Sequence, residues 1–274
     1  MISAKTESPQ TGILYVVGMG VKIPGHRTVE AAEALARCER IYTIVQEPPH
    51  VWLPPLREPD SSVVNLMSLY VEGALRSDNY SRVTKTIIEG LKEVATVGYV
   101  TYGNPLSYDS VAQALAREAE TAPWRLEVIA GISSIDTILC DLRLDMAPGV
   151  QVYEASWLVA SRTTLNAAAA VILLQLGHFG TARARYRQRR RPESLADLVS
   201  YLRGFYPESH TVTLVQSSSD ARPAAMTRVT LGELTNLRED QWAESVYIPP
   251  LHAPQLAPDV LARLTAEGPA TDRS

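Results

Sequence analysis

The chain has 274 residues, of which 46% are hydrophobic and 20% charged, and its formal net charge is −4. This composition is ordinary for a globular protein, and the negative charge argues against a general nucleic-acid binder. No apolar run reaches the length of a membrane span, residues 1–12 lack the apolar core of a signal peptide, and no cysteine–histidine spacing suits zinc. We therefore expect a cytoplasmic protein without a metal and without nucleic-acid or membrane partners. We also expect Cys38 and Cys140 to be buried structural thiols.

The first fifty residues predict a strand–helix–strand unit. An apolar run at 13–17 ends in a glycine turn at 18–20. Thr28 then caps an expected helix with one apolar face, and residues 41–45 form the second strand. A right-handed crossover places the glycine turn at the carboxyl ends of the strands, where open α/β sheets bind ligands. The GxG pattern by itself is a weak signal, because an ordinary tight turn has the same sequence.

The same order of strand, turn and helix continues along the first half. One strand closes in Gly-Asn-Pro and another in Gly-Ile-Ser-Ser. This repetition predicts an α/β fold with a mostly parallel sheet. The expected elements are strands at 63–66, 97–102 and 126–130, and helices at 80–91 and 110–120.

The second half changes character and predicts a mixed α/β domain. We expect strands at 150–152, 168–174, 211–216 and 245–248, and a helix at 194–205. The basic run 183–191 is typical of a solvated face or a loop, although it could also guide an acidic substrate. The predicted organisation is a flexible N-terminus at 1–11, an N-terminal α/β domain at 12–122, a C-terminal α/β domain at 123–251 and a tail at 252–274.

Tyr70, Arg76 and Tyr80 are the residues with the clearest chemical potential. A tyrosine has an unperturbed pKa of about 10 and can act as a base when a nearby cation stabilises its phenolate. Arg76 and Tyr80 stand four apart and can share one helix face. An arginine–tyrosine contact on the surface would leave the same pattern, so the residues alone do not decide between the two interpretations.

Five motifs in order resemble those of the class III S-adenosylmethionine-dependent methyltransferases, the tetrapyrrole methylase-like superfamily. They are the strand–GxG–helix–strand opening, TYGNP, GISS, LLQLG and SVYIPPL, spread over residues 12–251. The chain is particularly similar to the borosin-type peptide backbone α-N-methyltransferases. Those enzymes carry a tyrosine, an arginine six residues on, a tyrosine four beyond it, and another tyrosine before a GHPG loop. Here Tyr70, Arg76, Tyr80 and Tyr102 hold these places.

The resemblance implies a two-domain class III fold with the cofactor in the interdomain cleft, a homodimer, and S-adenosyl-L-methionine as methyl donor without a metal. It assigns catalysis to Tyr70, Arg76, Tyr80 and Tyr102. Two departures concern the loop, where Asn104 replaces a histidine and Leu106 a glycine. The implied cofactor-binding residues are Gly18, Asn104, Ser107, Ser133, Ser134, Gln175 and Ser245. Plainer roles stay open for some of them, since the two adjacent serines could cap a helix and the glutamine could end a strand.

We expect a methyltransferase of specialised metabolism whose acceptor is a small natural product with an indole or amide N–H. Deprotonation of an indole N–H makes C3 nucleophilic, so the same groups serve N- and C-methylation. The tail carries no apolar core peptide, which implies a separate acceptor molecule. The aromatic residues that could wall an acceptor site are Trp52, Tyr108, Tyr153 and Trp157. Alternatives are a split borosin-type enzyme acting on a separate precursor peptide, a non-catalytic ligand-binding protein on the same fold, and a corrin-type methylase.

Overall fold

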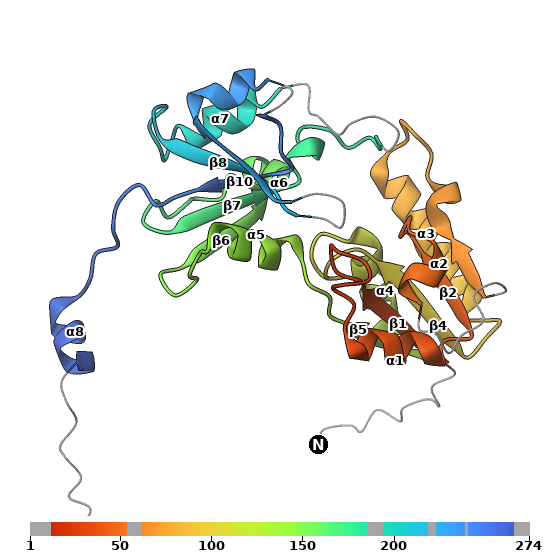
Figure 1. The fold of residues 1–274 in the computed structure, drawn as a ribbon. Coiled ribbons are helices and arrows are strands. Elements are labelled where there is room, and N and C mark those ends of the chain that lie inside the picture. Colours follow the sequence, from red (N-terminus) through yellow and green to blue (C-terminus); the bar gives the residue numbers. More distant parts are fainter. Residues whose placement is uncertain (1–11, 54–61, 186–193, 219–222, 239–240, 266–274) are drawn as a thin grey trace, which may run out of the picture.

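The chain forms two five-stranded sheets, one in each half (Figure 1). This computed structural model describes residues 12–53, 62–185, 194–218, 223–238 and 241–265. The expectations for residues 1–11, for most of the basic run and for the end of the tail lie outside these ranges. The predicted α/β fold class, a mostly parallel sheet followed by a mixed one, is confirmed.

The first sheet is parallel throughout and has the strand order β3-β2-β4-β1-β5. Parallel neighbours require a crossover connection, and helices supply most of these crossovers. The elements of this half are β1 (Gly12–Gly18), α1 (Val29–Arg37), β2 (Arg40–Thr43), α2 (Pro49–Trp52), β3 (Val63–Asn65), the 3₁₀ helix η1 (Leu66–Leu69), α3 (Arg76–Gly90), β4 (Thr96–Thr101), α4 (Ser110–Ala119) and β5 (Trp124–Ile129).

Both faces of the first sheet are covered, as its continuous apolar strands require. Along β1, Leu14 and Val16 pack with residues of α3 and α4, while Tyr15 and Val17 pack with residues of α1. All four side chains are buried. Helix α1 begins where the sequence predicts it, because the hydroxyl of Thr28 accepts a hydrogen bond from the Ala31 amide at 3.0 Å.

The second sheet has the order β6-β7-β10-β8-β9, and only its β6–β7 pair is parallel. Helices α6 and α7 cover one face, and α5 packs on the other. The elements of this half are α5 (Ser134–Leu142), β6 (Val150–Glu154), α6 (Ala155–Ser161), β7 (Ala170–Leu174), η2 (Leu176–His178), α7 (Ala196–Leu202), β8 (Thr211–Gln216), β9 (Ala225–Thr230), η3 (Gly232–Asn236), β10 (Ser245–Ile248) and α8 (Pro258–Thr265).

Several local expectations differ from the structure. The predicted boundary between the domains at 12–122 and 123–251 lies in the turn from α4 into β5. Strand β5 pairs with β1 from Gly12↔Trp124 to Val17↔Ile129, so the chain leaves the first sheet after β5. Helix α3 begins at Arg76, four residues before the predicted start, and α6 and β9 were not predicted. Cys38 is buried as expected, whereas Cys140 is exposed.

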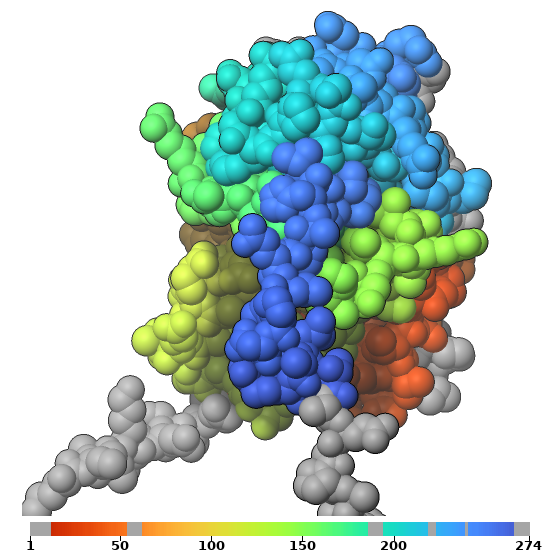
Figure 2. Space-filling view, turned by 90° about the vertical axis from the view of Figure 1, so that its left-hand side faces the viewer, coloured from red at the N-terminus to blue at the C-terminus, as the bar shows by residue number. Residues whose placement is uncertain are grey.

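The tail contains the amphipathic helix α8, which buries no residue. Figure 1 draws α8 away from both sheets, and in Figure 2 the same dark-blue segment projects toward the viewer. In the part of the chain that the structure describes, no helix combines the length and apolarity needed to cross a bilayer.

The three loops predicted to bind a ligand meet at the carboxyl edge of the first sheet. The amide of Gly103 donates to the carbonyl of Gly20 at 2.9 Å. Gly18 lies against the other two loops so closely that a Cβ on it would stand 2.4 Å from the Gly103 oxygen and 2.8 Å from the Gly131 nitrogen. Glycine is therefore required at this position by close backbone approach.

We expect Gly18→Ala to destabilise the protein by about 3 kcal/mol, at the upper end of overpacking costs, because the contacts are to backbone that cannot swing aside. Chemical denaturation measures the change in unfolding free energy. Gly25→Ala is the matched control, since its Cβ would have no neighbour nearer than 3.9 Å. Equal stability of the two variants would contradict the tight meeting of the loops.

Candidate functional site

An inner cavity of about 490 Å³ opens at this edge and is lined by residues of both halves. Its volume lies within the usual range for small-molecule sites, roughly 300–1,000 Å³. Its lining residues extend in the sequence from Val21 to Ser245. The predicted site residues in its wall are Tyr70, Arg76, Tyr80, Tyr102, Ser107, Ser134, Gln175 and Ser245.

Three predicted cofactor residues do not line this cavity. The Asn104 side chain accepts a hydrogen bond from the Leu106 amide at 3.0 Å and so shapes its own loop. Ser133 is buried and forms a capping box with Asp136 at the start of α5, which is the plainer role left open by the sequence. Gly18 has no side chain, and this allows the three loops to approach one another closely.

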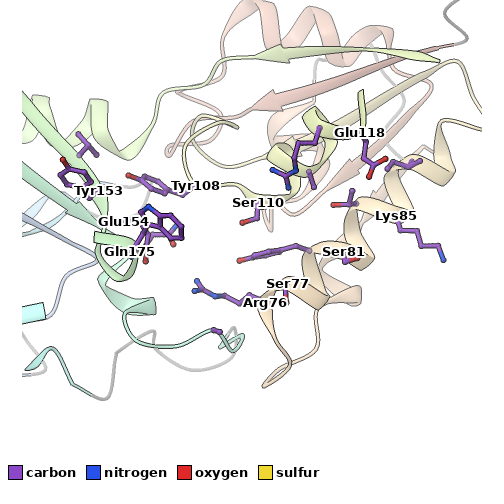
Figure 3. A pocket seen from close by; sticks show the side chains of 18 residues that line it. Arg76, Ser77, Ser81, Lys85, Tyr108, Ser110, Glu118, Tyr153, Glu154 and Gln175 are labelled. Carbon is purple, nitrogen blue, oxygen red and sulfur yellow. Dashed lines mark hydrogen bonds between the residues drawn. The ribbon is translucent and has the colours of Figure 1, made fainter. Parts of the chain in front are cut away.

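An outer cavity of about 990 Å³ adjoins the inner one. Figure 3 shows Arg76, Ser77 and Lys85 on the α3 side, facing Glu154 and Gln175 from the second half. Some side chains line both cavities and therefore mark their junction. These are Arg76, Tyr80, Tyr108, Ser110 and Gln175.

Arg76 is held at this junction by a short pairing that we call the clasp, residues 73–76 with 181–184. The Arg76 amide donates to the carbonyl of Ala182 at 2.8 Å, and its Nη2 donates to the carbonyl of Thr181 at 2.9 Å. Gly73 and Ala184 continue the pairing, with the Gly73 amide donating to the Ala184 carbonyl at 2.9 Å. The half-buried guanidinium is thus anchored from the second half while its helix belongs to the first.

Tyr70 and Tyr80 pack edge to face and line the inner cavity together with Arg76. Their ring centroids are 6.4 Å apart with an interplanar angle of 72°, and both side chains are half-buried. Because α3 begins at Arg76, Tyr80 lies one turn further along the same helix face. The i, i+4 relation predicted for Arg76 and Tyr80 is therefore present on a real helix.

The environment separates the tyrosines around the cavities by their readiness to ionise. Burial, and then the charge of Asp109, raise the pKa of Tyr99 well above its ordinary value. Burial, and then the charge of Glu154, raise the pKa of Tyr108. Both phenols are consequently held neutral, which suits hydrogen-bond donation and disfavours a role as base.

Tyr102 has a different setting, at the end of β4. Its hydroxyl donates to the Glu47 carboxylate at 2.7 Å and accepts from the Gln46 amide at 2.8 Å. The side chain is 39% exposed and lines the inner cavity together with Gln46.

Of the four aromatic residues expected to line an acceptor site, three line the outer cavity and one does not. Tyr108, Tyr153 and Trp157 line the outer cavity, and Trp157 is 70% exposed. The expectation for Trp52 is wrong, because its side chain is fully buried in the core beside α1. Apolarity in the sequence does not distinguish a cavity wall from a core position. The cavity residues with no prior signal include Gln46, Gln216, Ser217 and Glu244.

The donor set of the inner cavity fits the expected cofactor. The hydroxyls of Ser107, Ser134 and Ser245 and the amide of Gln175 can hydrogen-bond a carboxylate, a ribose or an adenine edge. Gln175 has a left-handed backbone with φ of 59°, which turns the chain at the end of β7. Among the described residues, no group of three or more histidine, cysteine or acidic side chains could hold a metal ion.

Two curated relatives are similar over nearly the whole chain. One is a methyltransferase/ribosomally synthesized type II borosin cyclic peptide precursor of Phlebiopsis gigantea, 23% identical over 96% of this chain and 48% of that protein. Another is the methyltransferase/ribosomally synthesized cyclic peptide dendrothelin A precursor of Dendrothele bispora, 24% identical over 92% of this chain and 61% of that protein. The chain thus spans about half to three fifths of the length of these relatives.

The fold is similar to that of solved methyltransferases. Uroporphyrin-III-C-methyltransferase from Thermus thermophilus aligns with a TM-score of 0.57 and 17% identity, covering 88% of this chain and 93% of that one. Residues 13–235 match the family of Tetrapyrrole (Corrin/Porphyrin) Methylases, which is most of the chain and includes both sheets except the last strand. The protein therefore belongs to the tetrapyrrole methylase family.

Proposed function

We propose that the protein is an S-adenosylmethionine-dependent methyltransferase that acts on an acceptor with a weakly acidic N–H. The observation that carries this proposal is the shared wall of the inner cavity. Tyr70, Arg76, Tyr80 and Tyr102 line it together with the serines and the glutamine expected at the cofactor. Family membership and the borosin relatives support the same reaction class.

In this proposal the inner cavity holds the cofactor through Ser134, Gln175 and Ser245. The bound sulfonium supplies an electrophilic methyl group with a good leaving group already attached. The chain itself needs to orient the acceptor, exclude water and receive a proton. The half-buried Ser134 and Gln175 and the buried Ser245 are suited to fixing polar edges in one orientation.

Proton removal falls to the phenols of the inner cavity, those of Tyr70, Tyr80 and Tyr102, which line it together with Arg76. A guanidinium next to a phenol stabilises the phenolate, and it also stabilises negative charge that develops on a deprotonated acceptor. Arg76 reaches both cavities, so its charge can serve an acceptor in the outer cavity. The neutral phenol of Tyr108 lines both cavities too and can donate a hydrogen bond to the acceptor.

The acceptor we favour is a small natural product with an indole or amide N–H, held in the outer cavity with its N–H directed into the inner one, where Tyr102 lies. The exposed indole of Trp157 and the ring of Tyr153 offer apolar surface for a flat acceptor. For an indole, loss of the N–H proton directs methylation to C3; for an amide, nitrogen receives the methyl group. We further propose that the protein works in the cytoplasm as a homodimer, whose mass light scattering would measure.

A second candidate function is backbone N-methylation of a separate peptide. It is favoured by the relatives named as borosin cyclic peptide precursors, which are similar over both halves of this chain. The outer cavity, about twice the volume of the inner one, has room for an extended segment.

We expect Gln175→Asn to weaken S-adenosylmethionine binding about tenfold, because withdrawing the amide by one methylene removes about one hydrogen bond. Asparagine tolerates the left-handed backbone at this position, so the fold is preserved. Isothermal titration calorimetry measures the affinity, with Gln113→Ala on the exposed side of α4 as control. Undiminished affinity would remove Gln175 from the cofactor site.

We expect Tyr70→Phe and Arg76→Ala each to lower turnover by about 100-fold or more while cofactor affinity is kept, since both alter proton removal and charge stabilisation. Steady-state kinetics and calorimetry separate the two effects. Tyr201→Phe is the control, because that hydroxyl bonds the Thr163 carbonyl away from the cavities. Normal turnover of either site variant would refute its catalytic role.

The experiment that tests the function is a methyl-transfer screen by mass spectrometry. The protein is incubated with S-adenosylmethionine and tryptophan derivatives, tryptophan cyclodipeptides or short linear peptides. One methyl group on an indole compound is the expected result. Several methyl groups along a peptide would establish the second candidate instead. Absence of cofactor binding would overturn the methyltransferase proposal.

A further inference from the structure

Glu47 is a carboxylate that neither the motifs nor the cavity wall single out, yet it contacts a proposed catalytic phenol. Its Oε2 lies 2.7 Å from the Tyr102 hydroxyl, and 55 sequence positions separate the two residues. Glu47 does not line the inner cavity, whereas Tyr102 does. The phenol therefore stands between the cavity and the carboxylate.

The direction of the hydrogen bonds follows from the chemistry of the partners. A backbone amide only donates, so the Tyr102 oxygen accepts from Gln46. An ionised carboxylate only accepts, so the Tyr102 proton is directed to Glu47. Because the Tyr102 proton points to Glu47 and away from the cavity, the phenol oxygen cannot donate a hydrogen bond to a methyl acceptor in the cavity. It can only accept a proton from that molecule.

The loop that carries Glu47 is anchored independently of the carboxylate. The Trp52 ring nitrogen donates to the Glu47 carbonyl at 2.8 Å, and Arg27 Nη1 donates to the Trp52 carbonyl at 2.6 Å. Trp52 itself is fully buried. The position of the carboxylate is thus set by backbone contacts that a side-chain substitution at residue 47 leaves in place.

We propose that Tyr102 and Glu47 form a proton relay that removes the acceptor N–H proton during methyl transfer; this rests on the proposed function. As the N–H bond breaks, the Tyr102 oxygen takes that proton and its own proton passes to Glu47. The electron pair left on the acceptor forms the bond to the methyl carbon, and the electrons of the broken sulfur–carbon bond return to the sulfonium sulfur. Glu47 is only partly buried, so it can release the proton to water.

In this proposal, charge stabilisation and proton transfer belong to different residues of the site. Arg76, held by the clasp, stabilises negative charge at the junction of the cavities, and Tyr102 with Glu47 carries the proton away. Tyr99 and Tyr108 are poorly suited to this task because their pKa values are raised. A carboxylate partner instead pulls on the Tyr102 proton as the acceptor proton arrives.

The decisive variant is Glu47→Gln, whose amide oxygen can still accept a hydrogen bond from Tyr102 but cannot take its proton. We expect turnover of the acceptor found in the screen to fall about 100-fold or more, with cofactor affinity and KM unchanged. Tyr102→Phe should lose a similar factor, and the double variant should lose no more than either single one, because both act in one step. The control Glu33→Gln, from an exposed ion pair with Arg37, should keep full turnover.

A readout without turnover uses ¹³C-labelled tyrosine and the cofactor-free protein. The ζ-carbon signal of Tyr102, assigned through Tyr102→Phe, should respond to an acid titration in the wild type and lose this response in Glu47→Gln. A turnover of Glu47→Gln near that of the wild type would show that Glu47 only orients the ring and would overturn the relay while leaving the methyltransferase proposal intact. If the wild type transfers no methyl group, the titration still tests the relay. A Tyr102 signal that responds to acid in Glu47→Gln as it does in the wild type would show that Tyr102 does not contact the Glu47 carboxylate, and would overturn the relay.

Discussion

Hydrogen bonds between residues 73–76 and 181–184 are the constraint on which the candidate site depends. They join a loop of the first half to a segment of the second, and they hold Arg76 by both its main chain and its guanidinium. A half-buried cation needs acceptors, and backbone carbonyls provide them without neutralising its charge. These contacts place the Arg76 guanidinium at the junction of the two cavities.

The close meeting of three glycine loops sets the other boundary of the site. Gly18, Gly103 and Gly131 approach one another without side chains in between, which brings the carboxyl ends of β1, β4 and β5 to one place. The strands then deliver Tyr102 and Ser134 to the same cavity from different loops. The backbone contacts are thus the means by which separate sequence motifs become one site.

Chemically similar side chains acquire different properties through their surroundings. Tyr99 is buried against Asp109, and Tyr108 lies near Glu154, so burial and negative charge hold both phenols neutral. Tyr102 instead directs its proton to Glu47 through a short hydrogen bond. The sequence shows three tyrosines within ten positions, and only their neighbours in space distinguish the two with raised pKa values from the one that contacts Glu47.

The sequence by itself determined the α/β class, the parallel first sheet and most element positions, because burial on one face of a helix or both faces of a strand leaves a local pattern. It also determined the glycine turns and the Tyr70–Arg76–Tyr80 spacing. Only the tertiary structure decided that β5 belongs to the first sheet, that Trp52 is core, that Arg76 meets residues 105 positions away, and that Glu47 contacts Tyr102. These outcomes depend on contacts between distant segments, about which local periodicity carries no information.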